Sequence, residues 1–379
     1  MLKGLYLSVL IGVGIPVPAP KFVMDAISEI QITNSKDRSG FQISLSLSKT
    51  ATLITTLLSS GFFDPTTTRV IIVATLNGIP HVLMDGIISN HQIAPANEPG
   101  KSTLTLTGED VSLLMDMVEV VVPLPALPDN AKVYTALAPF SFLGLTPIVI
   151  PPPVVTVRSP TDSWGSIPKQ TPLQFLKSLA QENGYIFQII PGPLPGQNIA
   201  YFGPEVNIPI PQRALSINMD AHTNVESLSF TVDGLAKKIN IYTIFDEITE
   251  KITIPIPVPN INAVKPPLGI RPAQPIPKVA YANSFSNNNT SEAMKKILGD
   301  VMSSANNPPS VSASGSLDVI RYKGILRSGM LVGVRGAGIT YDGLYSVDSV
   351  THNIKRGEYK QNFTLSRDGV ISNTPFVIP

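Results

Sequence analysis

The residues Gly100, Lys101 and Ser102 are of the types that end a phosphate-binding loop. Such a loop needs another glycine five positions before Gly100, so that the backbone can wrap a phosphate, and that position is Pro95. The residues that follow alternate threonine and leucine, which is typical of a strand, whereas a phosphate-binding loop leads into a helix. The stretch therefore predicts no nucleotide site.

A second glycine pattern lies near the start of the chain, where Gly12 and Gly14 follow an apolar run. A dinucleotide-binding turn would place its third glycine where this chain has Val17. It would also continue as a helix, which Pro16 and Pro18 prevent. We interpret the segment as a buried strand followed by a proline-rich connector.

Histidines and carboxylates form no recognisable catalytic or metal-binding pattern. The histidines, none of which has metal-ligand spacing, are His81, His91, His222 and His352. Three acidic residues near a predicted helix start are explained by capping and by the helix dipole: Asp110, Asp116 and Glu119. No Gly-x-Ser-x-Gly elbow occurs. A pair of glycosidase carboxylates stays open as an alternative, because its members meet only in space.

The composition indicates a protein that hides much of its surface. Of 379 residues, 15% are charged and 43% are hydrophobic, and 28 basic residues balance 27 acidic ones. An average soluble domain has about 25% charged residues. Balanced charge gives no indication of stable nucleic-acid binding. A chain this apolar is expected to bury surface against partners or copies of itself, so we predict an assembly component.

Proline and cysteine usage is also unusual. The chain has 36 prolines, well above the usual share of about 5%, and no cysteine, which excludes disulfides and thiolate metal sites. The apolar run from Leu5 to Val17 follows a single Lys3 and lacks a small-residue cleavage site, so we favour a buried strand over a signal peptide. Nothing reaches the ~18 apolar residues of a membrane-spanning helix, and we predict no membrane insertion.

Residues 1–119 predict a compact β-barrel or sandwich. The strand patterns are Leu5–Ile11, Ile27–Ile32, Gly40–Lys49, Arg69–Leu76, His81–Ile88 and Lys101–Thr107. Asn77-Gly78 is the strongest hairpin signal in this half. Helical spacing of apolar residues within 50–61, and again after Gly108-Glu109-Asp110, indicates two short helices.

Residues 120–205 predict a small α/β insertion with proline-rich connectors. Its first part is punctuated by prolines and is interpreted as irregular. A helix then begins with Thr171 as N-cap and Pro172 as its first residue, and ends at Gly184. The strand patterns that follow the helix are Tyr185–Ile190 and Gln197–Phe202.

Residues 206–379 predict a second barrel, interrupted by a proline-rich loop at 260–278 and a helix at about 290–304. Asn289 followed by Glu292 resembles a capping box at the start of that helix. The strand patterns ahead of the loop are Ser227–Val232, Lys238–Phe245 and Lys251–Val258.

The clearest pattern runs from Leu331 to Arg367. Asp342-Gly343 lies between apolar runs and predicts a tight hairpin turn, and Lys355–Glu358 predicts a second turn. Beyond it, apolar and polar residues alternate through Leu365, as in a half-buried antiparallel strand. The segment predicts a β-meander, whose aromatic residues are expected to pack across strands rather than to cradle a ligand.

The residue order of this meander resembles the C-terminal signature of the phage late control D family, the central hub proteins of contractile phage tails and related injection systems. The residues that carry the resemblance are Gly336, Gly338, Tyr341, Asp342, Gly343, Tyr345, Val347, Val350, His352, Gly357, Tyr359, Phe363, Leu365 and Arg367. Gly108-Glu109-Asp110 ahead of a helix is similar to a transition that follows the N-terminal barrel in the same family.

The resemblance implies a mainly β fold with two tail-tube-like β-barrel domains and a small α/β domain. It implies a homotrimer whose ring joins the hexameric inner tail tube to the trimeric spike, and the residues themselves predict no enzyme, cofactor or metal site in the chain. The implied partners are a tail tube protein, a separate spike protein, baseplate wedge proteins and a tape measure protein. DNA would pass through the ring without stable binding.

The implied location is a virion tail baseplate or an assembled injection particle, made in the bacterial cytoplasm. The alternative function is a β-rich secreted enzyme or a carbohydrate-binding module of a particle. Such a protein would need a concave site with convergent polar groups, and the sequence contains no motif for one.

Overall fold

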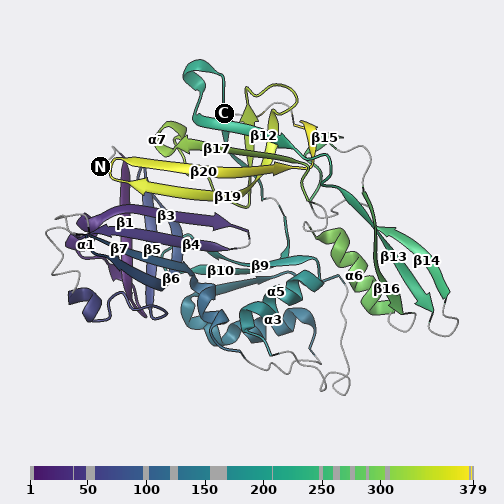
Figure 1. Cartoon of the computed structure of the whole chain (residues 1–379), viewed down its shortest axis with the longest axis horizontal. Helices are drawn as coiled ribbons and strands as arrows, with labels where there is room; N and C mark the ends of the chain where they lie inside the picture. Colours follow the sequence, from purple (N-terminus) through teal and green to yellow (C-terminus); the bar gives the residue numbers. More distant parts are fainter. Residues whose placement is uncertain are drawn as a thin grey trace.

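The computed structural model describes residues 4–36, 38–47, 56–96, 102–119, 127–153, 169–206, 208–246, 251–258, 265–273, 278–286, 290–303, 308–374 and 377. The predicted mainly β fold is confirmed, with one long sheet, three small sheets and several helices (Figure 1). Of the helices in these residues, none is both long and apolar enough to cross a membrane.

The N-terminal part of the long sheet has the strand order β3-β4-β7-β6-β5-β1-β2. Its elements are β1 (Leu5–Val13), β2 (Val17–Pro18), α1 (Lys21–Ala26), β3 (Ile27–Ser35), β4 (Ser39–Ser46), β5 (Thr68–Leu76), β6 (Ile79–Ala94) and β7 (Thr103–Asp110). The predicted hairpin turn is confirmed, since Asn77 and Gly78 link β5 to β6 with φ angles of 52° and 83°. The sequence patterns did not predict α1.

The two short helices predicted in this half differ from the structure. Residues 56–59 form a helical turn, while the preceding part of that prediction, and most of the Gly100–Ser102 stretch, lie outside the described residues. After Gly108-Glu109-Asp110 the chain forms a 3-10 helix of two turns, η1 (Val111–Asp116), and the Asp110 carboxylate caps it by accepting from the backbone N–H of Ser112 (2.9 Å).

The C-terminal part of the sheet has the order β12-β17-β20-β19-β18-β11. Its elements are β11 (Ile208–Ser216), η3 (Asp220–His222), β12 (Val225–Val232), β17 (Val311–Asp318), α7 (Val319–Tyr322), β18 (Met330–Arg335), β19 (Gly343–Lys355) and β20 (Glu358–Arg367). Antiparallel pairing of β19 with β3, from Ser349–Ser35 to Lys355–Glu29, joins this part to the N-terminal strands, so both belong to one sheet (Figure 1).

The meander is confirmed, but one of its turns was predicted wrongly. Lys355 and Glu358 pair at the end of a two-residue turn, as expected. Asp342-Gly343, in contrast, is not a two-residue turn, because Gly343 already pairs with Val334 and the loop covers residues 336–342. The Asp342 carboxylate accepts a hydrogen bond from the backbone N–H of Ala337 (2.7 Å) and so closes this longer loop.

The α/β part contains α3 (Asp129–Leu137), η2 (Ala138–Leu143), β8 (Leu145–Val149), α5 (Pro172–Glu182), β9 (Tyr185–Pro191) and β10 (Asn198–Pro204). The predicted helix is confirmed: Thr171 and Gln174 form a capping box, and Gly184 follows its end with a φ of 68°. The prediction of irregular structure before it was wrong for α3 and β8. The prolines cluster ahead of α3, whose own residues 129–137 contain none.

A three-stranded sheet projects beside this part, with the order β14-β13-β16 (Figure 1). Its elements are β13 (Lys238–Asp246), β14 (Lys251–Val258), β16 (Lys278–Ser286) and the adjoining α6 (Thr290–Met302). The predicted loop at 260–278 contains a short strand, β15 (Gly269–Pro272), which pairs with β21 (Gly369–Ser372). The predicted cap Asn289 lies outside the described residues.

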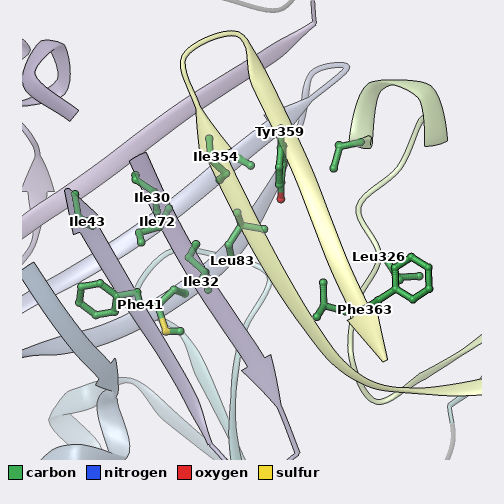
Figure 2. Packing of buried hydrophobic residues seen from close by; sticks show 14 of the residues in the cluster. Ile30, Ile32, Phe41, Ile43, Ile72, Leu83, Leu326, Ile354, Tyr359 and Phe363 are labelled. Carbon is green, nitrogen blue, oxygen red and sulfur yellow. The ribbon is translucent and has the colours of Figure 1, made fainter. Parts of the chain in front are cut away.

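The main core crosses the boundary between the first and the last strands of the chain. Figure 2 shows Ile30 and Ile32 of β3 beside Ile354 and Tyr359 of the C-terminal strands. All four side chains are buried, and they belong to one apolar cluster. A second cluster, centred on Leu176 of α5, holds the α/β part together. Burial of apolar area therefore connects strands that are more than 300 residues apart in sequence (Thr33 and Thr351 are separated by 318).

Candidate functional site

Arg367, the last residue of the family-like pattern, is a buried anchor. Only 1% of its surface is exposed, and its guanidinium donates to the carbonyl oxygens of Gly369 (2.7 Å), Asp342 (3.0 Å) and Thr340 (2.8 Å). The guanidinium also lies over the ring of Tyr345, 4.4 Å from its centroid. Arg367 therefore fixes the loop between β18 and β19 to the end of β20.

Tyrosines complete the same anchor. The hydroxyl of Tyr345 donates to the carbonyl of Tyr341 (2.8 Å), and burial raises the pKa of Tyr345 to about 12. Tyr341 stacks on Phe230 of β12, with ring centroids 4.6 Å apart. The predicted aromatic residues thus contact one another and the backbone, and Tyr345 has no exposed surface for a ligand.

Two glycines of the pattern are required by close approach. A Cβ on Gly343, whose φ is 113°, would lie 2.0 Å from the Cβ of Ser372. A Cβ on Gly336, whose φ is 83°, would lie 1.9 Å from the carbonyl oxygen of Ile217. Gly338 and Gly357 lie in turns with open space around them. The first two positions accept only glycine without a shift of the backbone.

His352 belongs to a buried polar group inside the sheet. Its Nδ1 lies 2.7 Å from the hydroxyl of Tyr359, and the amide of Gln361 exchanges hydrogen bonds with the backbone of Leu326 (2.8 and 2.9 Å). Burial lowers the pKa of His352 to about 3, so the imidazole is neutral at physiological pH. The other members of the pattern fill the core and are buried: Val347, Val350, Phe363 and Leu365.

The remaining candidates for chemistry do not converge. His81 contacts Arg327 (2.8 Å), His91 contacts the carbonyl of Phe63 (3.3 Å), and His222 lies in η3. Asp110 caps η1, and Asp116 accepts from the Thr171 hydroxyl (2.5 Å). Within the described part of the chain, no group of three or more acidic, histidine or cysteine side chains has an arrangement that holds a metal.

A feature that the sequence patterns did not single out is an uncharged polar face on the long sheet, which we call the hydroxyl face. Its members on β12, β17, β20, β19 and β3 are Ser227, Ser229, Ser314, Ser316, Asn362, Thr364, Ser349, Thr351 and Thr33. All but Thr33 line an open groove of about 420 Å³. The alternation of serine and threonine with buried residues along these strands is the sequence signal for this face.

The hydroxyl groups of this face bond to one another across the strands. Ser227 bonds to Ser316 (2.8 Å), Ser229 to Ser314 (3.0 Å), Ser349 to Thr364 (2.7 Å) and Thr33 to Thr351 (3.2 Å). Charged side chains stand at its borders in ion pairs. Examples are Lys360–Glu226 (3.0 Å) at one border and Lys36–Asp348 (2.7 Å) at the other. The face thus offers hydroxyls without net charge.

Comparisons with solved structures identify tail proteins with the same fold. The tail protein from Neisseria meningitidis MC58 superposes with a TM-score of 0.60 at 14% identity, covering 99% of this chain and 100% of that one. The prophage MuSo2 43 kDa tail protein from Shewanella oneidensis gives 0.59 at 12% identity, with 96% and 100% covered.

The E. coli c3393 protein, a component of the type VI secretion system, gives a TM-score of 0.52 at 10% identity, with 93% and 77% covered. No family model matches the sequence, and no curated protein matches it either. The resemblance stated from the meander is therefore supported by three-dimensional structure and not by overall sequence similarity. The chain has the fold of phage tail proteins and of related secretion-system components.

Proposed function

We propose that this protein is the structural hub of a contractile tail or a phage-like injection system. In this proposal, three copies form a ring that joins the hexameric inner tube to the trimeric spike, with wedge and tape measure proteins as further partners. The observation that carries the proposal is the likeness in fold to the Neisseria tail protein, which extends over 99% of this chain. The role itself is built on shape and symmetry, without bond chemistry.

The proposal keeps the division into residues 1–119, 120–205 and 206–379. The first and last units supply the strands of the long sheet, and the middle unit packs against them. Arg69 on β5 supports this arrangement, because it donates to the carbonyl of Leu143 (2.9 Å) in the middle unit. Two sheet-forming units per subunit would give a trimer six similar units around its axis, which suits a sixfold tube.

The hydroxyl face is the surface that best suits the wall of the central channel. It is concave, and it presents hydroxyls that are already paired with one another. It offers no basic side chains to hold phosphates and no broad apolar area to hold a protein. A polymer in transit would therefore meet few fixed binding sites. Charged pairs at the borders, such as Lys360–Glu226, leave the middle of the wall neutral.

Native mass spectrometry with negative-stain imaging of the purified protein tests the proposal. We expect particles with three times the chain mass of 40.6 kDa and ring-shaped projections. Addition of the tube protein from the same particle should give rings stacked on tubes. A protein that stays monomeric at all concentrations, with and without the tube protein, would reject the hub function.

Gly343 allows a sharper test of the meander. A side chain at this position collides with Ser372, so Gly343→Ala should distort the junction of β18 and β19 and reduce ring formation several-fold. The matched control is Gly324→Ala, where the nearest atom would lie at 3.4 Å and the backbone needs no positive φ. Equal ring yields for the two variants would contradict a role of this junction in assembly.

A further inference from the structure

Prolines occupy the outer strands of the sheets. Among the residues that the structure describes, β2, β8, β11, β14 and β15 each pair with a single neighbouring strand, which leaves one edge of each open. The prolines that they carry are Pro18, Pro147, Pro209, Pro211, Pro255, Pro257 and Pro272. Proline has no backbone N–H and blocks the addition of another strand at an edge. The high proline content of the chain thus serves, in part, to close sheet edges.

β12 is an exception to this pattern. It pairs only with β17 among the described strands, and its sequence Val-Glu-Ser-Leu-Ser-Phe-Thr-Val contains neither proline nor a basic residue. Its single charge, Glu226, is engaged by Lys360 (3.0 Å). Other outer strands without an internal proline are protected differently: β16 begins with Lys278, β9 ends with Pro191, and β21 is only four residues long. An eight-residue edge without such protection is suited to strand addition.

The register defines which backbone groups of β12 are available. The N–H of Asp233 donates to the carbonyl of Ser310 (2.8 Å), and hydrogen-bonded pairs alternate along an antiparallel ladder. Ser229 and Thr231 therefore direct their backbone groups toward β17. Leu228, Phe230 and Val232 direct theirs to the open edge.

The opposite end of the same sheet has a second open edge. β2 covers only Leu10 and Ile11 of β1, and the N–H of Ala19 binds the carbonyl of Val9 (2.8 Å). The segment Leu5–Ser8 has no partner strand on that side among the described residues, and it contains neither proline nor charge. Val9 uses its backbone carbonyl on the outer side of β1, and every second residue of a strand directs its backbone groups to the same side. Leu5 and Leu7 therefore direct their backbone groups outward.

The two edges match in the direction of their side chains. On β12, the residues with outward backbone groups include Leu228 and Phe230, whose side chains pack against the core. On β1 they are Leu5 and Leu7, whose side chains also pack against the core. Pairing the two edges would place apolar side chains beside apolar ones, and it would continue the hydroxyl face onto Tyr6 and Ser8 of β1.

We propose that β12 of one copy pairs with the Leu5–Ser8 segment of β1 in a second copy of this chain. Because the two edges belong to opposite ends of one sheet, each copy uses both, and the contact is head-to-tail. Such a contact forms a ring of three when successive copies are related by a third of a turn. The inference rests on the proposed homotrimer, and it identifies the surface that holds the trimer together. A second copy is favoured over another protein because the chain itself supplies both complementary edges.

Disulfide trapping tests this pairing, and the absence of cysteine from the chain makes the background clean. Residues directly opposite each other in a non-hydrogen-bonded pair have Cα atoms about 4.5 Å apart, which suits a disulfide. Ser8→Cys is combined in turn with Ser227→Cys, Ser229→Cys and Thr231→Cys to scan the register. We expect at least one combination to give covalent dimers and trimers after mild oxidation, at ten-fold or greater yield over the control.

The matched control is Ser8→Cys combined with Ser314→Cys, since Ser314 lies opposite Ser229 on the inner neighbour β17. Exchange of amide hydrogens gives a second measurement on the unmodified protein, where the β12 peptide should gain protection in the ring. If wild-type rings form but no combination exceeds the control, the edge pairing is wrong and the hub function stands. If Ser229→Cys alone forms dimers, β12 pairs with itself, which also overturns the proposal. If no rings form, the hub function fails as well.

Discussion

Two buried arginines join parts of this molecule in different ways. Arg69 of β5 forms a two-pronged ion pair with Asp85 (2.7 and 2.8 Å), and it also donates to the carbonyl of Leu143 in the α/β part. Arg367 of β20 instead donates its hydrogen bonds to three backbone carbonyls within the C-terminal part. Arg69 connects a strand of the long sheet to the α/β part, whereas Arg367 holds a loop to its own neighbouring strands.

The difference lies in what compensates the buried charge. Arg69 is neutralised by a side chain that substitution can remove or replace, and Asn198 also donates to Asp85 (2.9 Å). Arg367 is stabilised by the ring of Tyr345 and by three backbone carbonyls, and the carbonyls remain when a neighbouring side chain is changed. A paired substitution of Arg69 and Asp85 can therefore remove both buried charges together. No substitution of a neighbouring side chain can replace the hydrogen bonds that Arg367 donates to backbone carbonyls.

The largest effect is expected for Asp85→Ala. This change leaves Arg69 buried without its counter-charge and should lower the free energy of unfolding by about 3–5 kcal/mol. The double change Arg69→Met with Asp85→Leu removes both charges and should recover most of that loss. Urea denaturation of the three proteins measures the difference. A double variant no more stable than Asp85→Ala would show that the ion pair is not the dominant interaction at this joint.

Arg367→Met should lower the free energy of unfolding by about 3 kcal/mol, because three buried carbonyls lose their donor. Arg367→Lys should retain part of the stability, since an ammonium group reaches fewer acceptors than a guanidinium does. No single neighbouring substitution should rescue Arg367→Met, in contrast to the Arg69 joint. A rescue by Asp342→Asn, which leaves the backbone in place, would refute the distinction between the two arginines.

His352 gives a pH-dependent effect among the same C-terminal strands as Arg367, and the effect is small near neutral pH. Its folded-state pKa of about 3 lies below the unfolded value, so the neutral ring stabilises the fold fully above about pH 6.5. This stabilisation is lost as the pH falls toward 3, at up to about 1.4 kcal/mol per pH unit. Urea denaturation from pH 7 to 4 measures how the free energy of unfolding changes with pH, and this free energy should fall less steeply for His352→Gln than for wild type. Identical slopes would contradict a buried neutral histidine.

The smallest effect is expected at the unit that Arg69 connects. Thr171→Ala removes the cap of α5, where the hydroxyl accepts from the N–H of Gln174 (3.2 Å), together with the hydrogen bond that the hydroxyl donates to Asp116 (2.5 Å), and should cost about 1–2 kcal/mol. Thr135→Ala in α3 is the matched control, because its exposed hydroxyl bonds only within its own helix (3.0 Å). Thermal unfolding compares the two. Equal midpoints would mean that the capping box contributes nothing to stability.

Local signals in the sequence predicted the local parts of the fold. Asn77-Gly78 predicted its hairpin, Thr171 predicted its helix, and the alternation after Lys355 predicted β20, because each depends on neighbouring residues. Helix α3 was missed because the prolines before it were taken as a sign of irregular structure, although they lie outside the helix. The seven-residue loop before Gly343 was missed because Asp342-Gly343 matches a two-residue turn equally well, whereas in the structure Asp342 binds back to Ala337 and Arg367 holds the loop from the end of β20.

No pattern in the sequence indicated that β3 pairs with β19, because each strand could pair equally well with any strand edge that has the same alternation of apolar and polar residues. The hydroxyl face was missed for a related reason. Serine and threonine at alternate positions predict only an exposed side of a strand, and the face emerges when several such strands lie side by side. The resemblance in the meander, in contrast, depended on a short run of residues, and it led to the fold of the whole chain.

The pairing of β3 with β19 has a consequence for how the protein is made. Thr33 leaves the ribosome long before Thr351, its partner 318 residues later, has been synthesised. The first strands of the nascent chain therefore wait with one edge unpaired until nearly the whole protein has been translated, and long-range pairing of this kind is slow. A chain that ends before β19 lacks the strand that pairs with β3, so it leaves the sheet without its C-terminal strands.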